Sequence, residues 1–143
     1  ADLREVHLGE WEGGSFRFHV AEGHPDAVRM MAEQRWDAVP GGESTDRFRA
    51  RVRAGLERIV AAHPDERVVV VSHGGVIGEL VRQAADGGSA FAFVGADNGS
   101  ITHLVITPDR WIVRRFNDTA HLADGFDLDP EVELPESDTG QSL

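Results

Sequence analysis

The hydrophobic positions are most regular in the middle of the chain, where they predict a long amphipathic helix over residues 44–63. Ser44 or Thr45 suits the N-cap, because a short hydroxyl side chain accepts a hydrogen bond from the first free N–H groups of a helix. Pro64 has no N–H group and is expected to end the helix. The apolar stripe falls at i, i+4, i+8, i+11 and i+12, which are Phe48, Val52, Leu56, Ile59 and Val60.

Shorter patterns predict three further helices and one β-hairpin. The helices are expected over residues 16–22, 26–36 and 76–85, between Gly and Pro residues that interrupt helical structure. Strands over residues 100–106 and 111–116 flank a Thr-Pro-Asp-Arg turn and should pair as a hairpin.

Residues 67–72 contain four consecutive valines, a pattern that predicts a strand covered on both faces. The helix expected over residues 76–85 follows soon after it. A buried strand that runs into a helix is typical of an α/β layer fold with a largely parallel sheet. The chain has 143 residues, which is enough for one hydrophobic core.

The turn between that strand and that helix is the first candidate for chemistry. His73 stands just beyond the carboxyl end of the strand, at the edge of an open α/β sheet where ligands bind. Gly74 and Gly75 leave room for an anion to approach the free N–H groups of the helix N-terminus. Local pattern alone also allows a second interpretation, in which His73 merely caps the helix and the glycines serve the turn.

Composition and charge narrow the classes of function. Without Cys or Lys, the chain has no disulfide, thiolate nucleophile, P-loop lysine or Schiff base. Its net charge of −11 disfavours nucleic acid and anionic membranes as partners. No apolar run is long enough to span a bilayer and the first residues do not resemble a secretory signal, so we expect a cytoplasmic protein. Residues 123–143 carry seven acids and no base, and we expect a solvated, disordered tail after a domain over residues 1–122.

Other charged and polar residues are weaker candidates. Glu5 lies among apolar neighbours and suits a general acid, although an exposed strand-end carboxylate explains the same pattern. The seven histidines show no spacing of known metal-ligand type, so we expect no metal site. Five arginines of the long helix are expected to form a solvated face: Arg47, Arg49, Arg51, Arg53 and Arg58.

Five segments, taken in order, resemble the later portion of a histidine phosphatase superfamily domain of the phosphoglycerate mutase-like type: LREVHLGEWEG, PGGES, VVVVSHGGVI, NGSI and FNDTAHL. The resemblance implies a three-layer α/β fold with a mostly parallel sheet, and a phosphorylated small molecule as substrate. It also implies that Glu5 is the acid that protonates the leaving oxygen, that His73 binds the phosphoryl group, and that the Gly74 N–H contacts phosphate. No metal or other cofactor is implied. The final segment would fix loops at the rim of the site through Asn117, Asp118 and His121.

The sequence also departs from the family. The nucleophilic histidine of the family belongs to an Arg-His-Gly motif on the first strand, and no Arg-His pair occurs in this chain. The resemblance therefore indicates a fragment, incomplete at the N-terminus and inactive by itself, whose missing strand would lie beside residues 67–72. Without that strand, backbone edges of the sheet would be exposed.

Several interpretations remain open. The favoured one is a phosphomonoester hydrolase that acts through phosphohistidine, because the 73 − 5 = 68 positions between Glu5 and His73 are similar to compact phosphatase-type members. A phosphoglycerate mutase-type transferase is the alternative within the family. A non-catalytic phosphate-binding module, or a fragment that associates with a second copy or a partner through open strand edges, would also explain the absent nucleophile.

Overall fold

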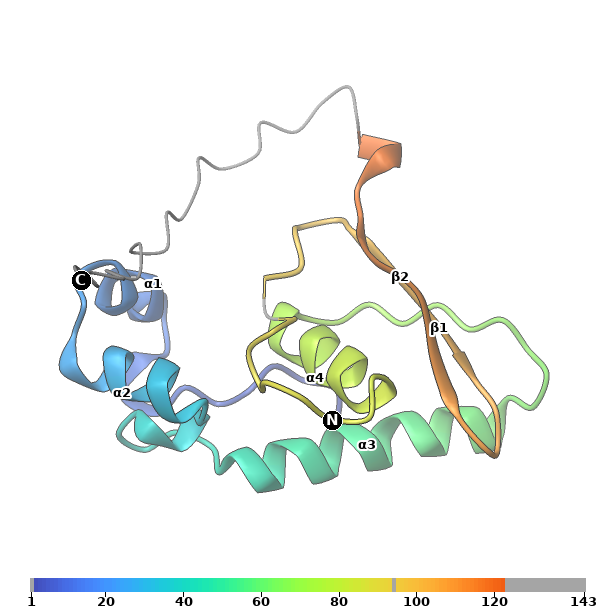
Figure 1. Ribbon diagram of the computed structural model, residues 1–143, viewed down its shortest axis with the longest axis horizontal. Helices are drawn as coiled ribbons and strands as arrows, with labels where there is room; N and C mark the ends of the chain where they lie inside the picture. Colours follow the sequence, from blue (N-terminus) through green and yellow to red (C-terminus); the bar gives the residue numbers. More distant parts are fainter. Residues whose placement is uncertain (1, 94, 123–143) are drawn as a thin grey trace, which may run out of the picture.

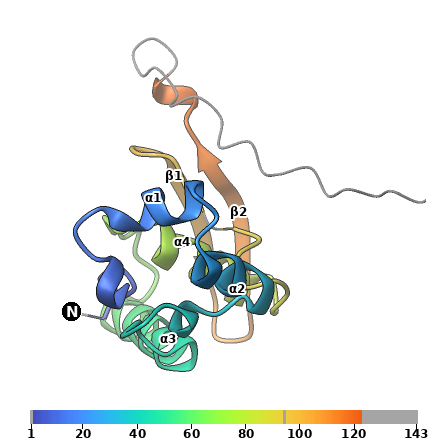
Figure 2. The same cartoon turned by 90° about the vertical axis from the view of Figure 1, so that its left-hand side faces the viewer.

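The computed structural model of the chain describes residues 2–93 and 95–122. Figure 1 shows α3 running along one side, α4 lying above it, and a β-hairpin beside α4; in Figure 2 the same hairpin stands behind α2 and α4. The helices and strands in chain order are η1 (Gly9–Trp11), α1 (Ser15–Ala21), α2 (Pro25–Glu33), η2 (Trp36–Ala38), α3 (Thr45–Ala62), α4 (Gly74–Ala84), β1 (Ile101–Ile106), β2 (Trp111–Asp118) and η3 (Ala120–Leu122).

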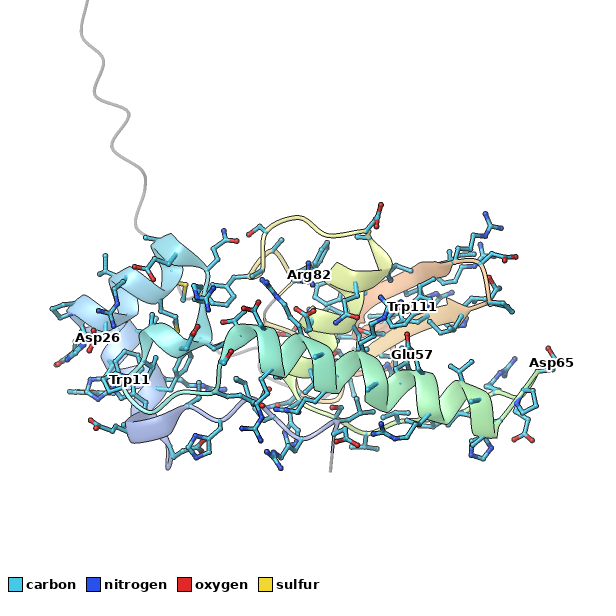
Figure 3. The ribbon with its side chains drawn as sticks, turned by 90° about the horizontal axis from the view of Figure 1, so that it is seen from below. Trp11, Asp26, Glu57, Asp65, Arg82 and Trp111 are labelled. Carbon is cyan, nitrogen blue, oxygen red and sulfur yellow. The ribbon has the colours of Figure 1, made fainter. Side chains whose placement is uncertain are left out.

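The predicted long helix is confirmed as α3, which begins after the N-cap residue Ser44, although the Ser44 side chain makes no capping hydrogen bond. Its apolar stripe is buried, with Phe48 1% and Val52 0% exposed. These side chains join a single core cluster with residues of α4, including Val76 and Leu80. Figure 3 shows α3 running from the side of the molecule where Trp11 lies toward Asp65 at the opposite side, so this helix extends along much of the molecule.

The predicted helix over residues 26–36 is shorter than expected. It ends at Glu33 because Gln34 adopts a left-handed conformation with φ 53°, and the chain then turns into η2. The helix predicted to begin at Val76 begins earlier, at Gly74. Both differences lie at helix ends, where local sequence patterns discriminate poorly between helix and turn.

The predicted hairpin is confirmed. β1 and β2 pair antiparallel with Ile106 opposite Trp111, and the Thr107 N–H donates to the Arg110 carbonyl at 2.9 Å to close the turn. The ladder is irregular near its open end, where Asn117 has φ 54°. Trp111 packs back on α3, with the guanidinium carbon of Arg53 5.1 Å from its ring centroid.

The predicted valine strand over residues 67–72 is wrong in the part of the chain that the structure describes. The segment belongs to no strand, and Figure 1 draws it as coil between α3 and α4. Val69 is 86% and Val71 94% exposed, which is the opposite of a strand covered on both faces. A strand is defined by backbone partners, and among residues 2–93 and 95–122 the only sheet is the two-stranded antiparallel hairpin. The α/β class is retained, but the parallel sheet is not present in these residues.

The predicted acidic tail over residues 123–143 lies outside the described residues. No helix within residues 2–93 and 95–122 is long and apolar enough to cross a membrane.

Candidate active site

The carboxylate of Glu5 lies against the first turn of α4, although the two are far apart in sequence. Its Oε2 accepts a hydrogen bond from the backbone N–H of Gly75 at 3.0 Å, and its Oε1 accepts one from Val6 N–H at 2.9 Å. A Cβ atom on Gly75 would stand 2.5 Å from the Glu5 Oε1. The approach therefore needs glycine at position 75, and the carboxylate plane is held by two backbone donors.

His73 and Gly74 complete the turn that Glu5 contacts. His73 is the N-cap of α4 with extended φ −120° and ψ 161°, and its carbonyl accepts the first helical bond from Ile77 N–H at 2.9 Å. Its imidazole is exposed to solvent. Within residues 2–93 and 95–122, the Gly74 N–H donates to no acceptor, and the nearest atoms to a Cβ there would be backbone atoms of Ala96 at 3.9 Å and 4.0 Å. The structure thus gathers all three predicted site residues at one helix N-terminus.

A second contact joins the two segments of the site. The Ser72 hydroxyl donates to the Leu3 carbonyl at 3.0 Å. The residue before His73 is therefore tied to the residue two before Glu5. This bond holds the two chain segments that carry Glu5 and His73 next to each other.

The predicted solvated face of arginines is wrong for Arg51. Its side chain is only 11% exposed and forms a two-bond ion pair with Glu43, whose side chain is 5% exposed. The Arg51 guanidinium holds the pKa of Glu43 below its usual range. Other arginines of α3 are open to solvent: Arg53 is 56% and Arg58 59% exposed. Glu43 belongs to the PGGES segment, but the sequence pattern assigned it no role, and periodicity along the helix does not separate Arg51 from its neighbours.

The residues predicted to fix loops do so. The Asn117 carboxamide binds both the backbone and the side chain of Asp97, at 2.7 Å and 2.8 Å. His121 Nε2 lies 3.0 Å from the Gly99 carbonyl. Asp118 accepts a hydrogen bond from Ala120 N–H, and this bond together with Arg115 lowers the pKa of Asp118. Because Ala96 is adjacent to Asp97 and faces Gly74, this loop borders the N-terminus of α4.

A pocket of about 340 Å³ lies beside the predicted site and does not contain it. Its lining residues are Arg4, His7, Gly41, Gly42, Glu43, Ser44 and Arg47. None of the three predicted site residues lines this pocket. Residues 2–93 and 95–122 contain no group of three or more His, Asp or Glu side chains arranged to hold a metal ion.

Comparison with known proteins identifies the family of the chain. Residues 1–119 match the family described as "Histidine phosphatase superfamily (branch 1)". The chain belongs to the histidine phosphatase superfamily. The resemblance found in the sequence is thereby confirmed.

Individual relatives support the same family. The chain is 34% identical over 128 residues to "Phosphoglycerate mutase-like protein 4" of Arabidopsis thaliana, a match that covers 87% of this chain and 55% of the relative. It is 32% identical over 136 residues to "Metal-independent phosphoserine phosphatase" of the same plant, with 90% and 56% covered. The chain therefore spans about half the length of these curated relatives.

A solved structure supports the fold. A mycobacterial glucosyl-3-phosphoglycerate phosphatase, in complex with inorganic phosphate, superposes with a TM-score of 0.66 at 32% identity. The match covers 83% of this chain and 63% of that one. The predicted phosphoglycerate mutase-like α/β fold is therefore confirmed, although the described residues contain only the hairpin as sheet.

Proposed function

We propose that this chain is part of a phosphomonoester hydrolase that acts through a phosphohistidine intermediate. The observation that carries the proposal is the hydrogen bond between the Glu5 carboxylate and the backbone N–H of Gly75. Gly75 directly follows His73 and Gly74 in the chain. In this proposal the Glu5 carboxylate carries the proton, and the His73 imidazole and the Gly74 N–H lie at the same helix N-terminus.

Phosphate recognition follows from the positive electrostatics of that turn. The α4 N-terminus offers the Gly74 N–H, which is unpaired within the described residues, and the positive end of the helix dipole, and both attract an anion. The Gly74 N–H and the His73 imidazole are both open to an incoming phosphoryl group. Donors placed at the equatorial oxygens stabilise the charge of the transition state, which is the principal requirement of phosphoryl transfer.

Glu5 is proposed to carry the proton in both half-reactions. In the first, a histidine nucleophile forms the N–P bond while the P–O bond to the leaving group breaks and the Glu5 carboxyl proton passes to the leaving oxygen. In the second, Glu5 as carboxylate takes a proton from water, the water oxygen forms the new P–O bond, and the N–P bond breaks. The two backbone donors hold the carboxylate in one orientation for both steps.

The nucleophile is proposed to come from an Arg-His-Gly strand outside this chain. The chain contains no Arg-His pair and spans about half of its curated relatives. The valine segment over residues 67–72 supports the proposal, because its apolar side chains are exposed and its backbone belongs to no strand within residues 2–93 and 95–122, which suits a neighbouring strand. The chain alone is then expected to bind phosphate weakly and to turn over no substrate.

The first experiment establishes the length of the protein and then its activity. Codons upstream of Ala1, or the intact mass of the native protein, show whether an Arg-His-Gly segment is present. The longer protein is then assayed on p-nitrophenyl phosphate, with Glu5→Gln and His73→Ala. Each change is expected to lower kcat about 10²-fold or more, because each removes a transition-state contact.

Matched controls and a trapped intermediate decide between the alternatives. Glu10→Gln and His103→Ala change exposed residues of the same types and are expected to leave kcat unchanged. A ³²P label that is stable to base and labile to acid indicates phosphohistidine, and its release as inorganic phosphate indicates a phosphatase. Transfer of the label to an acceptor molecule would instead favour a mutase. Undiminished turnover in both Glu5→Gln and His73→Ala overturns the site.

A further inference from the structure

Arg51 of α3 holds the backbone of the segment that carries Glu5. Its guanidinium donates to three carbonyl oxygens, those of Asp2 at 2.7 Å, Arg4 at 2.8 Å and Glu5 at 2.9 Å. The two remaining N–H groups donate to the Glu43 carboxylate at 2.8 Å and 2.7 Å. An arginine has five N–H donors, and here every one of them is used.

Glu43 also forms hydrogen bonds to this segment. Its backbone N–H donates to the His7 carbonyl at 2.8 Å, and its Oε2 accepts from the His7 N–H at 3.3 Å. Residues 2–7 belong to no strand, so no backbone ladder holds them in register. Their position therefore depends on side-chain donors and acceptors, chiefly the Arg51–Glu43 pair.

One peptide unit connects Arg51 to the side-chain carboxylate of Glu5. The carbonyl of the Glu5–Val6 peptide accepts from Arg51 Nη2, while the N–H of the same peptide donates to Glu5 Oε1 at 2.9 Å. The other oxygen, Oε2, reaches Gly75 at 3.0 Å. A displacement of this peptide would therefore disturb the position of the carboxylate at the N-terminus of α4.

We propose that Arg51, braced by Glu43, is a positioning residue that fixes the Glu5 carboxylate at the N-terminus of α4. This rests on the proposed function, in which Glu5 carries the proton. Arg51 acts through the backbone and does not touch the substrate. Lysine cannot replace it, because one ammonium with three donors cannot serve a carboxylate with two parallel bonds and three carbonyls as well.

The first test is kinetic and uses the longer protein that contains the nucleophile. Arg51→Lys is expected to lower kcat about tenfold to a hundredfold, the range for a small misplacement of a reacting group, with little change in KM. Arg53→Lys is the matched control: it lies in the same helix, is 56% exposed and pairs with Glu57 at 2.8 Å. Its kcat is expected to equal that of the unchanged protein.

A second measurement separates positioning from general loss of structure. In a Glu5→Gln background, Arg51→Lys is expected to lower kcat little further, because both changes impair the same group. Added guanidinium ion is expected to restore part of the kcat of Arg51→Ala, while an equal concentration of methylammonium is not. Fully additive effects, or a loss that disappears when rates are expressed per folded molecule, overturn the proposal.

A third readout needs no turnover. Amide hydrogen exchange of Val6 and Gly75, followed by NMR, reports the two N–H groups that bind the Glu5 carboxylate. Both are expected to exchange faster in Arg51→Lys and in Glu43→Gln, and to be unchanged in Arg53→Lys. Unchanged protection in the first two variants overturns the positioning role. A Glu5→Gln enzyme with full kcat would instead overturn the proton-carrying role proposed for Glu5, and the exchange result would still decide whether Arg51 positions the carboxylate.

Discussion

The Oε2 atom of Glu5 accepts a 3.0 Å hydrogen bond from the backbone N–H of Gly75, across 70 positions of sequence. The bond places a carboxylate at the positive end of a helix, in a space that only glycine leaves open. The position of the Glu5 carboxylate therefore depends on the absence of a side chain at Gly75.

This contact predicts the result of Gly75→Ala. The new Cβ would stand 2.5 Å from Glu5 Oε1, so the carboxylate must leave its position. We expect kcat of the proposed longer protein to fall about 10²-fold, because the change displaces the carboxylate that is proposed to carry the proton. Steady-state kinetics and urea unfolding measure the two effects of the change.

Gly74→Ala provides the stability comparison for that experiment. A Cβ at this position would have no close neighbour nearer than 3.9 Å, so the free energy of unfolding should change little. Gly75→Ala with full kcat would contradict the assigned position of Glu5.

The Glu43–Arg51 pair predicts a large cost for removing one partner. Glu43→Ala leaves the Arg51 guanidinium largely buried without its carboxylate, and we expect a loss of about 3 kcal/mol or more in the free energy of unfolding. Glu57→Ala breaks the exposed pair with Arg53 in the same helix and should cost about 0.5 kcal/mol or less. Urea unfolding of both variants at neutral pH makes the comparison, and equal losses would contradict the prediction.

The lowered pKa of Asp37 predicts that this residue makes a pH-dependent contribution to the free energy of unfolding. Its bonds to the Arg35 guanidinium and the Thr45 hydroxyl lower its pKa from 3.8 to about 2. Because the folded pKa lies below the unfolded one, the contribution is complete above the unfolded pKa and is lost as the pH falls through about 2.

The free energy of unfolding, measured from about pH 5 to about pH 2, tests this contribution, because the unfolded and the folded pKa of Asp37 both fall in this range. The unchanged protein should lose more stability across it than Asp37→Asn, which has no carboxylate to protonate. Glu33→Gln, a change at an exposed position nearby, serves as the control and should keep the unchanged protein's pH profile. Identical profiles for the unchanged protein and Asp37→Asn would show that the Asp37 interactions contribute nothing.

The exposed valines predict a difference between the 143-residue chain and the proposed longer protein. Val71 is 94% exposed, so Val71→Thr should change the free energy of unfolding of the 143-residue chain by less than about 0.5 kcal/mol. In the longer protein a neighbouring strand would cover this side chain, and burial of the added hydroxyl should cost about 1 kcal/mol or more. Val52→Thr, at a position 0% exposed, should destabilise both proteins. An equally small effect of Val71→Thr in both would contradict the pairing of another strand with residues 67–72.

Local patterns were sufficient for the helices and the hairpin. The stripe from Phe48 to Leu56 identified α3, and the Thr-Pro-Asp-Arg turn identified β1 and β2, because both depend on neighbours within a few residues. The same patterns failed for residues 67–72. Four valines describe a segment suited to a sheet interior, but the partners of a strand lie elsewhere in the sequence.

The candidate site was found only in part. His73 and Gly74 follow from the turn between a valine segment and a helix, and the role expected of Glu5 came from family resemblance. Arg51 was placed among solvated arginines because its spacing matches theirs. Its burial depends on contacts with carbonyl groups 46 to 49 positions away, which no periodicity reveals.

The sequence by itself determined the helices, the hairpin turn, the absence of thiol and lysine chemistry, and the motifs of the histidine phosphatase superfamily. These depend on residue type and short-range spacing. Only the tertiary structure decided that Glu5 reaches Gly75, that Arg51 holds the backbone of Glu5, and that the valines have no cover in the described residues. The reason is physical: hydrogen bonds and burial between distant segments depend on how the helices pack, and packing is a property of the whole fold.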